Sequence, residues 1–101
     1  MPSKLRRVVL DVLKPHDPNI VELSQKLAVL PGVSGVNITI YEVDRQVENA
    51  KITMEGDDLN YGLILEHILD AGGTVHSIDE VAAGKIMIEE SHTPQDATTF
   101  G

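Results

Sequence analysis

Hydrophobic and polar residues alternate with a period of two in four stretches of the chain and with a helical period in two others. A period of two predicts β-strands, whereas apolar residues three or four positions apart predict amphipathic helices. The predicted strands are 5–13, 36–41, 50–55 and 74–81, and the predicted helices are 20–30 and 59–69. The first strand is rich in β-branched residues and apolar on both faces, so we expect it to lie inside a sheet.

The order of these elements predicts a fold of the α+β class. Two βαβ units in tandem, each with a right-handed crossover, give a ferredoxin-like βαββαβ sandwich. In this architecture an antiparallel sheet carries both helices on one face. The first and third strands are central and the second and fourth are edges.

Turn-forming residues predict where the helices begin and end. Either Asp17, with Pro18 at the first helical position, or Asn19 can cap the first helix, and 56–58 (Gly-Asp-Asp) is expected to cap the second. The pairs Pro31-Gly32 and Gly72-Gly73 are expected to end them.

The last part of the chain is less regular. Val75, Ile78 and Val81 are spaced by three, which predicts a bulge or an irregular edge strand. The short apolar run within 85–90 predicts a short extra C-terminal strand. We therefore expect one ferredoxin-like domain over 1–90 and a flexible C-terminal tail over 91–101.

Composition and charge restrict the possible functions. The 101 residues carry a net charge of −8, which argues against nucleic acid or an anionic membrane surface as partner. Residues 1–14 are net +3 and the rest is net −11, so complementary patches could drive self-association. The absence of cysteine excludes disulfides and thiolate metal sites. No apolar run is long enough for a membrane helix, and a cytoplasmic location is expected.

Asp11 is a carboxylate in an otherwise apolar central strand. Alternation places it on the open sheet face with Val9 and Leu13, where it could pair with Lys51, bond to Thr39 or Thr53, or bind a ligand. The apolar share of this face also suggests that another subunit covers it.

Carboxylates and one imidazole near the sheet edges form a candidate metal site. Ca²⁺, Mg²⁺ or Mn²⁺ would suit this oxygen-rich set, and no other cofactor is expected. Because most of these residues come from opposite edges of the sheet, a metal site would have to form between two subunits. The sequence favours the alternative, a solvated or salt-bridged edge, over such a site. The candidate metal ligands are Asp11, Glu42, Asp44, His76, Asp79 and Glu80.

Three strings carry a family resemblance: RRVVLDVLKP over 6–15, VSGVNITIYEVD over 33–44 and VHSIDEVAAGK over 75–85. They resemble the archaeal family of unknown function DUF211, over about residues 4–90. The resemblance implies a ferredoxin-like domain and an archaeal cytoplasmic source, and it implies no activity. The turn at 30–36 is also similar to that of ACT regulatory domains, which share this topology.

No nucleophile elbow, phosphate-binding loop or paired carboxylates occur in a catalytic arrangement, so we expect no enzyme and no catalytic residues. The leading hypothesis is a non-enzymatic homo-oligomer that assembles through sheet edges and the open sheet face. The alternative is an ACT-like regulatory domain that binds a small-molecule metabolite or a divalent cation at a subunit interface.

Overall fold

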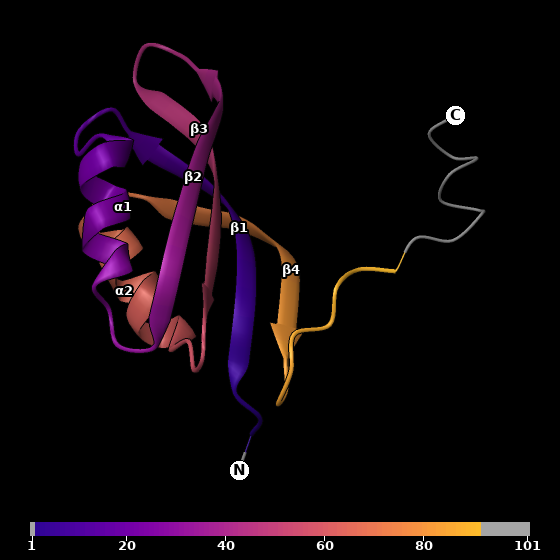
Figure 1. Ribbon diagram of the computed structural model, residues 1–101. Coiled ribbons are helices and arrows are strands. Elements are labelled where there is room, and N and C mark those ends of the chain that lie inside the picture. The colour runs from indigo at the N-terminus through magenta and orange to yellow at the C-terminus, as the bar shows by residue number, and fades with distance from the viewer. Residues whose placement is uncertain (1, 92–101) are drawn as a thin grey trace, which may run out of the picture.

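The computed structural model describes residues 2–91 and has the predicted ferredoxin-like fold. Both helices lie on one face of a sheet whose strands run in the order β2-β3-β1-β4, and each neighbouring pair is antiparallel (Figure 1). The predicted central positions of the first and third strands are confirmed. The elements are β1 (Leu5–Pro15), α1 (Ile20–Ala28), β2 (Val33–Val43), β3 (Val47–Gly56), α2 (Tyr61–Asp70) and β4 (Thr74–Ala83).

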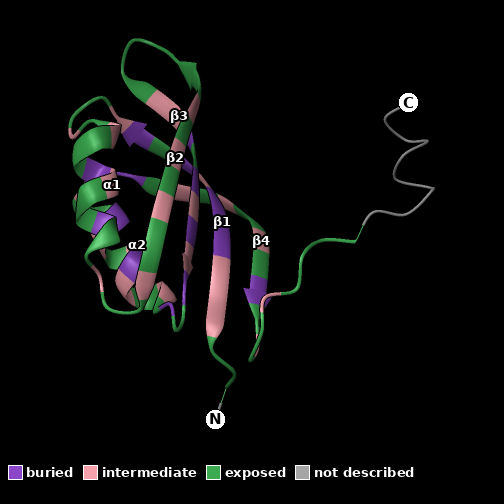
Figure 2. Ribbon diagram, viewed as in Figure 1, coloured by how far each residue is buried: buried purple, intermediate pink, exposed green. Residues whose placement is uncertain are grey.

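The core lies between the sheet and the two helices (Figure 2). Alternation along β1 turns Val8, Leu10 and Val12 toward the helices, where each is at most 1% exposed. The helices contribute aliphatic side chains three or four positions apart, and β3 adds two more. These buried partners are Leu23, Leu27, Ile52, Met54, Ile64 and Ile68.

Asparagine side chains cap both helices. Oδ1 of Asn19 accepts a hydrogen bond from the backbone N–H of Glu22 at 2.9 Å, so the second of the two predicted caps for α1 is the one used. The predicted cap of α2 at 56–58 is wrong, because Asn60 caps that helix. The N–H of Leu59 donates to the carbonyl of Leu5 at 2.8 Å, which holds the preceding linker against β1.

Strand β4 is irregular, as its spacing predicts. Its pairing with β1 shifts register three times. The strand also bends, so that its second half lies on the side of β1 that is away from the helices (Figure 1). Ile78 and Val81 pair with Leu10 and Val8, yet they are 53% and 60% exposed. Neither helix therefore covers the outer part of this edge strand.

The extra strand predicted over 85–90 is wrong, because these residues form no strand. Gly84, with φ +130°, turns the chain at the end of β4, and its N–H donates to the carbonyl of Lys4 at 2.9 Å. Arg6 then donates to the carbonyl of Lys85 at 3.3 Å. These bonds fold the segment back toward the start of β1.

Of the flexible tail predicted over 91–101, all but the first residue lies outside the described residues. Within the described part of the chain, neither helix has the length and apolar character needed to cross a membrane.

Candidate functional site

A hollow of about 290 Å³, here called the open-face pocket, lies where β1 and β4 meet the β2–β3 hairpin. It contains four of the six predicted metal ligands, and three aliphatic side chains and an amide complete its wall. The lining residues are Asp11, Leu13, Glu42, Val43, Asp44, Val47, Asn49 and His76.

Asp11 occupies the predicted position but lacks the predicted contacts. It is opposite Lys51 on β3 and Ser77 on β4, and it shares the pocket with Leu13. No ion pair or hydrogen bond joins it to its lysine neighbour or to a threonine among residues 2–91. Its Oδ1 atom is shielded from solvent and has no hydrogen-bond partner there. Such an unpartnered buried oxygen costs about 1–3 kcal/mol.

Asp44 builds the turn at the mouth of the pocket. Its Oδ1 accepts the backbone N–H groups of Val47 and Gln46, each at 2.9 Å. These bonds favour the carboxylate and lower the pKa of Asp44 below its ordinary value, so the group is ionised at neutral pH.

The other two predicted ligands lie elsewhere. Asp79 and Glu80 line a separate hollow beside β4, together with Glu89 and Glu90. Across residues 2–91, no three histidine, aspartate or glutamate side chains are placed to hold one metal ion. A metal site completed by a second subunit stays a prediction.

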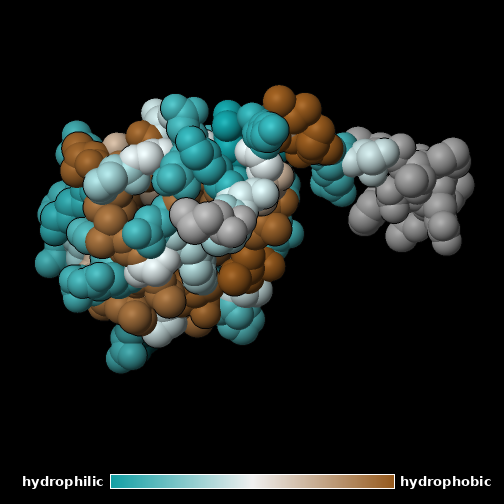
Figure 3. Space-filling view, turned by 90° about the horizontal axis from the view of Figure 1, so that it is seen from below, coloured by the Kyte–Doolittle hydropathy of each residue, from teal (hydrophilic) through white to brown (hydrophobic). Residues whose placement is uncertain are grey.

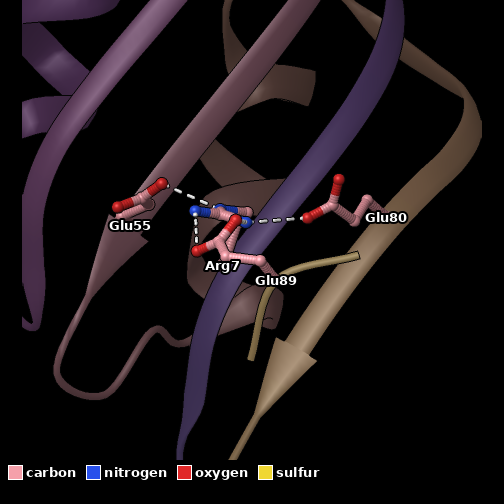
Figure 4. Close-up of polar contacts among 4 residues, drawn as sticks. All are labelled: Arg7, Glu55, Glu80 and Glu89. Carbon is pink, nitrogen blue, oxygen red and sulfur yellow. Dashed lines mark hydrogen bonds and ion pairs between the residues drawn. The ribbon is translucent and has the colours of Figure 1, made fainter. Parts of the chain in front are cut away.

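Arg7 organises a charge cluster that sequence reasoning missed (Figure 4). Its guanidinium donates to Glu55 on β3 at 2.8 Å, to Glu80 on β4 at 2.9 Å, and to Glu89 at 2.7 and 3.0 Å. Glu89 belongs to the returning segment after β4, so this bidentate bond holds that segment over the sheet. The available signal was the position of Arg7, which alternation puts on the open face between two neighbouring strands.

The cluster changes the titration of its members. Hydrogen bonds to Glu89, Glu80 and Glu55 raise the pKa of Arg7 above its ordinary value, and Arg7 lowers the pKa of Glu89. The positive charge of Arg7 is therefore balanced by carboxylates of its own chain.

The other two basic residues of β1 also lie near carboxylates, Arg6 loosely and Lys14 through a hydrogen bond. Arg6 lies 3.8 Å from Asp57, and Nζ of Lys14 lies 2.7 Å from Glu48. Three of the four basic residues among the first 14 thus lie near carboxylates of the same chain.

Lys14 is a buried charge on the helix side of the sheet. Its side chain is 1% exposed, and its Nζ donates to Glu48 and to the carbonyl of Pro15, each at 2.7 Å. The hydrogen bond that Lys14 donates to Glu48 lowers the pKa of Glu48 below its ordinary value. Glu48 in turn lies 3.3 Å from Nδ1 of His16, and it raises the pKa of that histidine, helped by the carbonyl of Arg45.

Comparison with known proteins places the chain in a family. The family model DUF211, described as uncharacterized ArCR, matches residues 6–97. The chain belongs to the DUF211 family. The uncharacterized protein MJ0319 of Methanocaldococcus jannaschii is 55% identical to it over 92 residues, which cover 91% of this chain and 95% of that protein. The predicted resemblance is confirmed, and neither the DUF211 description nor the relative's name states an activity.

The Lys14–Glu48–His16 contacts predict a pH dependence for this DUF211 chain. Because the pKa of His16 is raised in the folded state, its stabilising contribution is complete below its ordinary value of about 6.5. It is lost as the pH rises through the raised folded value. Urea unfolding at pH 5.5 and 8.5 should therefore show a greater loss of stability at high pH in the native chain than in His16→Asn. Equal losses in the two proteins would contradict the assignment.

Proposed function

We propose that this chain is a non-enzymatic homo-oligomer that assembles through the outer edge of β4 and the adjoining sheet surface. Strand β4 is the last strand of the sheet, and no strand pairs with its outer edge within residues 2–91. Free backbone N–H and C=O groups on such an edge readily pair with a strand from another chain. A second copy supplies a strand of the same length and twist.

Exposed aliphatic side chains along this edge support the proposal and are the observation that carries it. Beyond Ile78 and Val81, the segment after β4 exposes Ile86 and Ile88, at 66% and 65%. Figure 3 shows that brown, apolar surface lies among teal, hydrophilic surface on the face of the molecule seen from below. Four large aliphatic side chains are thus exposed over some ten residues, and apolar side chains that gather in this way are typical of interaction surfaces.

The open face exposes Leu13, Tyr41 and Val43, at 37%, 56% and 62%, in keeping with cover by another subunit. Val9 on the same face is 6% exposed, so the single chain already buries that side chain. The basic residues of β1 are paired internally. Assembly is therefore expected to rest on apolar contact and strand pairing, and to persist at high salt.

Light scattering on the eluting protein tests the proposal. We expect the native chain at micromolar concentration to have a mass that is a multiple of 11.0 kDa, in low salt and in 1 M NaCl. Val81→Lys should lower the mass to that of a monomer. Val21→Lys on α1 is the matched control, because Val21 is 62% exposed and Val81 60%. A monomeric native chain, or equal effects of both variants, would overturn the proposal.

Binding of a small metabolite or a divalent cation is a second candidate function. The observation that favours it is the open-face pocket, which Asp11, Glu42 and Asp44 line. A ligand that binds only the folded protein raises its melting temperature. A screen of amino acids, nucleotides and divalent cations in which no compound shifts the melting temperature would count against it.

A further inference from the structure

We propose that the returning segment (84–91) regulates assembly. When Glu89 is bound to Arg7, the segment adds Ile86 and Ile88 to the surface that a second copy contacts, and when this bond is broken it does not. The inference rests on the proposed function, assembly through the edge of β4, and names the device that controls it.

The returning segment is attached to the sheet at two places. At its start, the N–H of Gly84 donates to the carbonyl of the residue before β1 at 2.9 Å, and the carbonyl of Lys85 accepts a bond from a side chain of β1 at 3.3 Å. Further along, Glu89 accepts hydrogen bonds from Arg7 at 2.7 and 3.0 Å (Figure 4). Within the described part of the chain, no other hydrogen bond joins 86–91 to the sheet. Glu89 is therefore the far anchor of the segment.

Little apolar burial holds the segment in place between these anchors. Ile86 and Ile88 are 66% and 65% exposed. A hollow of about 550 Å³ lies between the segment and β4, with Val81 of the strand and Ile88 of the segment in its wall. Since hydrophobic stabilisation depends on the apolar surface removed from water, these exposed side chains do little to keep the segment against the sheet. Its position therefore depends on the bond between Glu89 and Arg7.

Arg7 is a fixed point for this attachment. Its side chain is 15% exposed and also donates to Glu55 on β3 at 2.8 Å and to Glu80 on β4 at 2.9 Å. These two carboxylates hold the guanidinium group between neighbouring strands whether or not the third is bound. Glu89 is 67% exposed and belongs to a segment outside the sheet. Loss of this one carboxylate therefore frees the segment and leaves the sheet intact.

The attached segment enlarges the apolar surface of the β4 edge. Ile78 and Val81 on the strand are 53% and 60% exposed, and the attachment places Ile88 across the hollow from Val81. A second copy that contacts strand and segment together buries the aliphatic side chains of both. If the segment were detached, it would have to be ordered when the second copy binds, and this loss of conformational entropy would weaken the contact. Glu89 thus acts on assembly by preorganising the segment.

Light scattering over a dilution series tests the effect on assembly. In Glu89→Gln we expect the concentration at which half of the chains are assembled to rise at least about fivefold. Glu90→Gln should leave this concentration unchanged. It is the matched control, because Glu90 is the next residue, carries the same charge and makes no ion pair within residues 2–91. In the double variant Ile86→Ser/Ile88→Ser, assembly weakens, and adding Glu89→Gln should cause no further loss, since the anchor acts through these two side chains.

Trypsin tests the attachment itself, independently of assembly. Cleavage after Lys85 requires access to a carbonyl that accepts a hydrogen bond from Arg6, so the segment must leave the sheet to enter the protease. Below the concentration of half-assembly, Glu89→Gln should release the fragment 1–85 at least about fivefold faster than the native chain. Glu90→Gln should release it at the native rate. Mass spectrometry identifies the fragment.

Equal half-assembly concentrations in Glu89→Gln and Glu90→Gln would overturn the inference, and so would equal rates of cleavage. A further loss from Glu89→Gln in the chain that carries both serines would also contradict it, because the anchor would then act by another route. A native chain that is monomeric at every concentration would contradict the proposed function itself. An assembled native chain that is indifferent to the change at Glu89 would contradict only the regulatory role of the segment.

Discussion

Gly56→Ala is expected to destabilise the fold by about 4 kcal/mol or more, which is a larger loss of unfolding free energy than ordinary substitutions cause. A Cβ atom at Gly56 would overlap the carbonyl oxygen of Gly32 and lie 2.9 Å from its carbonyl carbon. The Cα of Val33 is 3.0 Å away. These are all backbone atoms, so no change of side-chain rotamer relieves the overlap, and β2 and β3 would have to separate at this end. Urea unfolding followed by circular dichroism measures the loss.

Gly35→Ala is the matched control for this prediction. Gly35 lies on β2 near the same end, its φ is not in the left-handed region, and nothing lies within 4 Å of its ideal Cβ position. Alanine there should change stability by less than about 1 kcal/mol, and it should stabilise if anything, since it restricts the unfolded chain. Similar losses from both alanines would show that the contact between Gly32 and Gly56 is not the cause.

Glu48→Met is expected to cost about 3 kcal/mol of unfolding free energy at pH 7, because it leaves the ammonium group of Lys14 buried without its carboxylate. Among the described residues, the carbonyl of Pro15 is then the one acceptor that remains for it. The double variant Lys14→Met/Glu48→Met should recover most of the loss, since an apolar pair of similar size avoids the desolvation of both charges. Denaturant unfolding of the three proteins gives the two differences.

An exposed ion pair supplies the control for the buried one. Asp57 is 87% exposed where it faces Arg6 at 3.8 Å, so Asp57→Asn should cost no more than about 0.5 kcal/mol. The loss in Glu48→Met should also persist in 0.5 M NaCl, because a buried pair is poorly screened. If the double variant is as unstable as Glu48→Met, the lost stability does not come from an unpaired lysine.

The sheet could be predicted because β1 carries its own evidence of position. Its β-branched residues are apolar on both faces, and this pattern distinguishes an inner strand from an edge strand. The irregular spacing of Val75, Ile78 and Val81 likewise predicted the register shifts of β4. Periodicity is a local property, and these features depend on local alternation.

The site was less predictable because its contacts join residues far apart in the sequence. Arg7 binds Glu55, Glu80 and Glu89, and only register decides which carboxylates come within its reach. The returning segment shows the same limit. The apolar run within 85–90 resembles a strand locally, but Gly84 and Arg7 direct it across the sheet. The face of Asp11 followed from alternation, whereas alternation gave no sign that its Oδ1 atom would lack a partner among residues 2–91.

The position of β1 also bears on how the chain folds during synthesis. It is the first strand to be made, yet its two neighbours, β3 and β4, come from residues 47–56 and 74–83. A nascent chain that ends before β4 leaves one side of β1 unpaired. Contacts between such distant segments close slowly, and unpaired strands are prone to aggregate in the meantime. We therefore expect the domain to fold only when its translation is nearly complete, with the unfinished sheet as the species that chaperones protect.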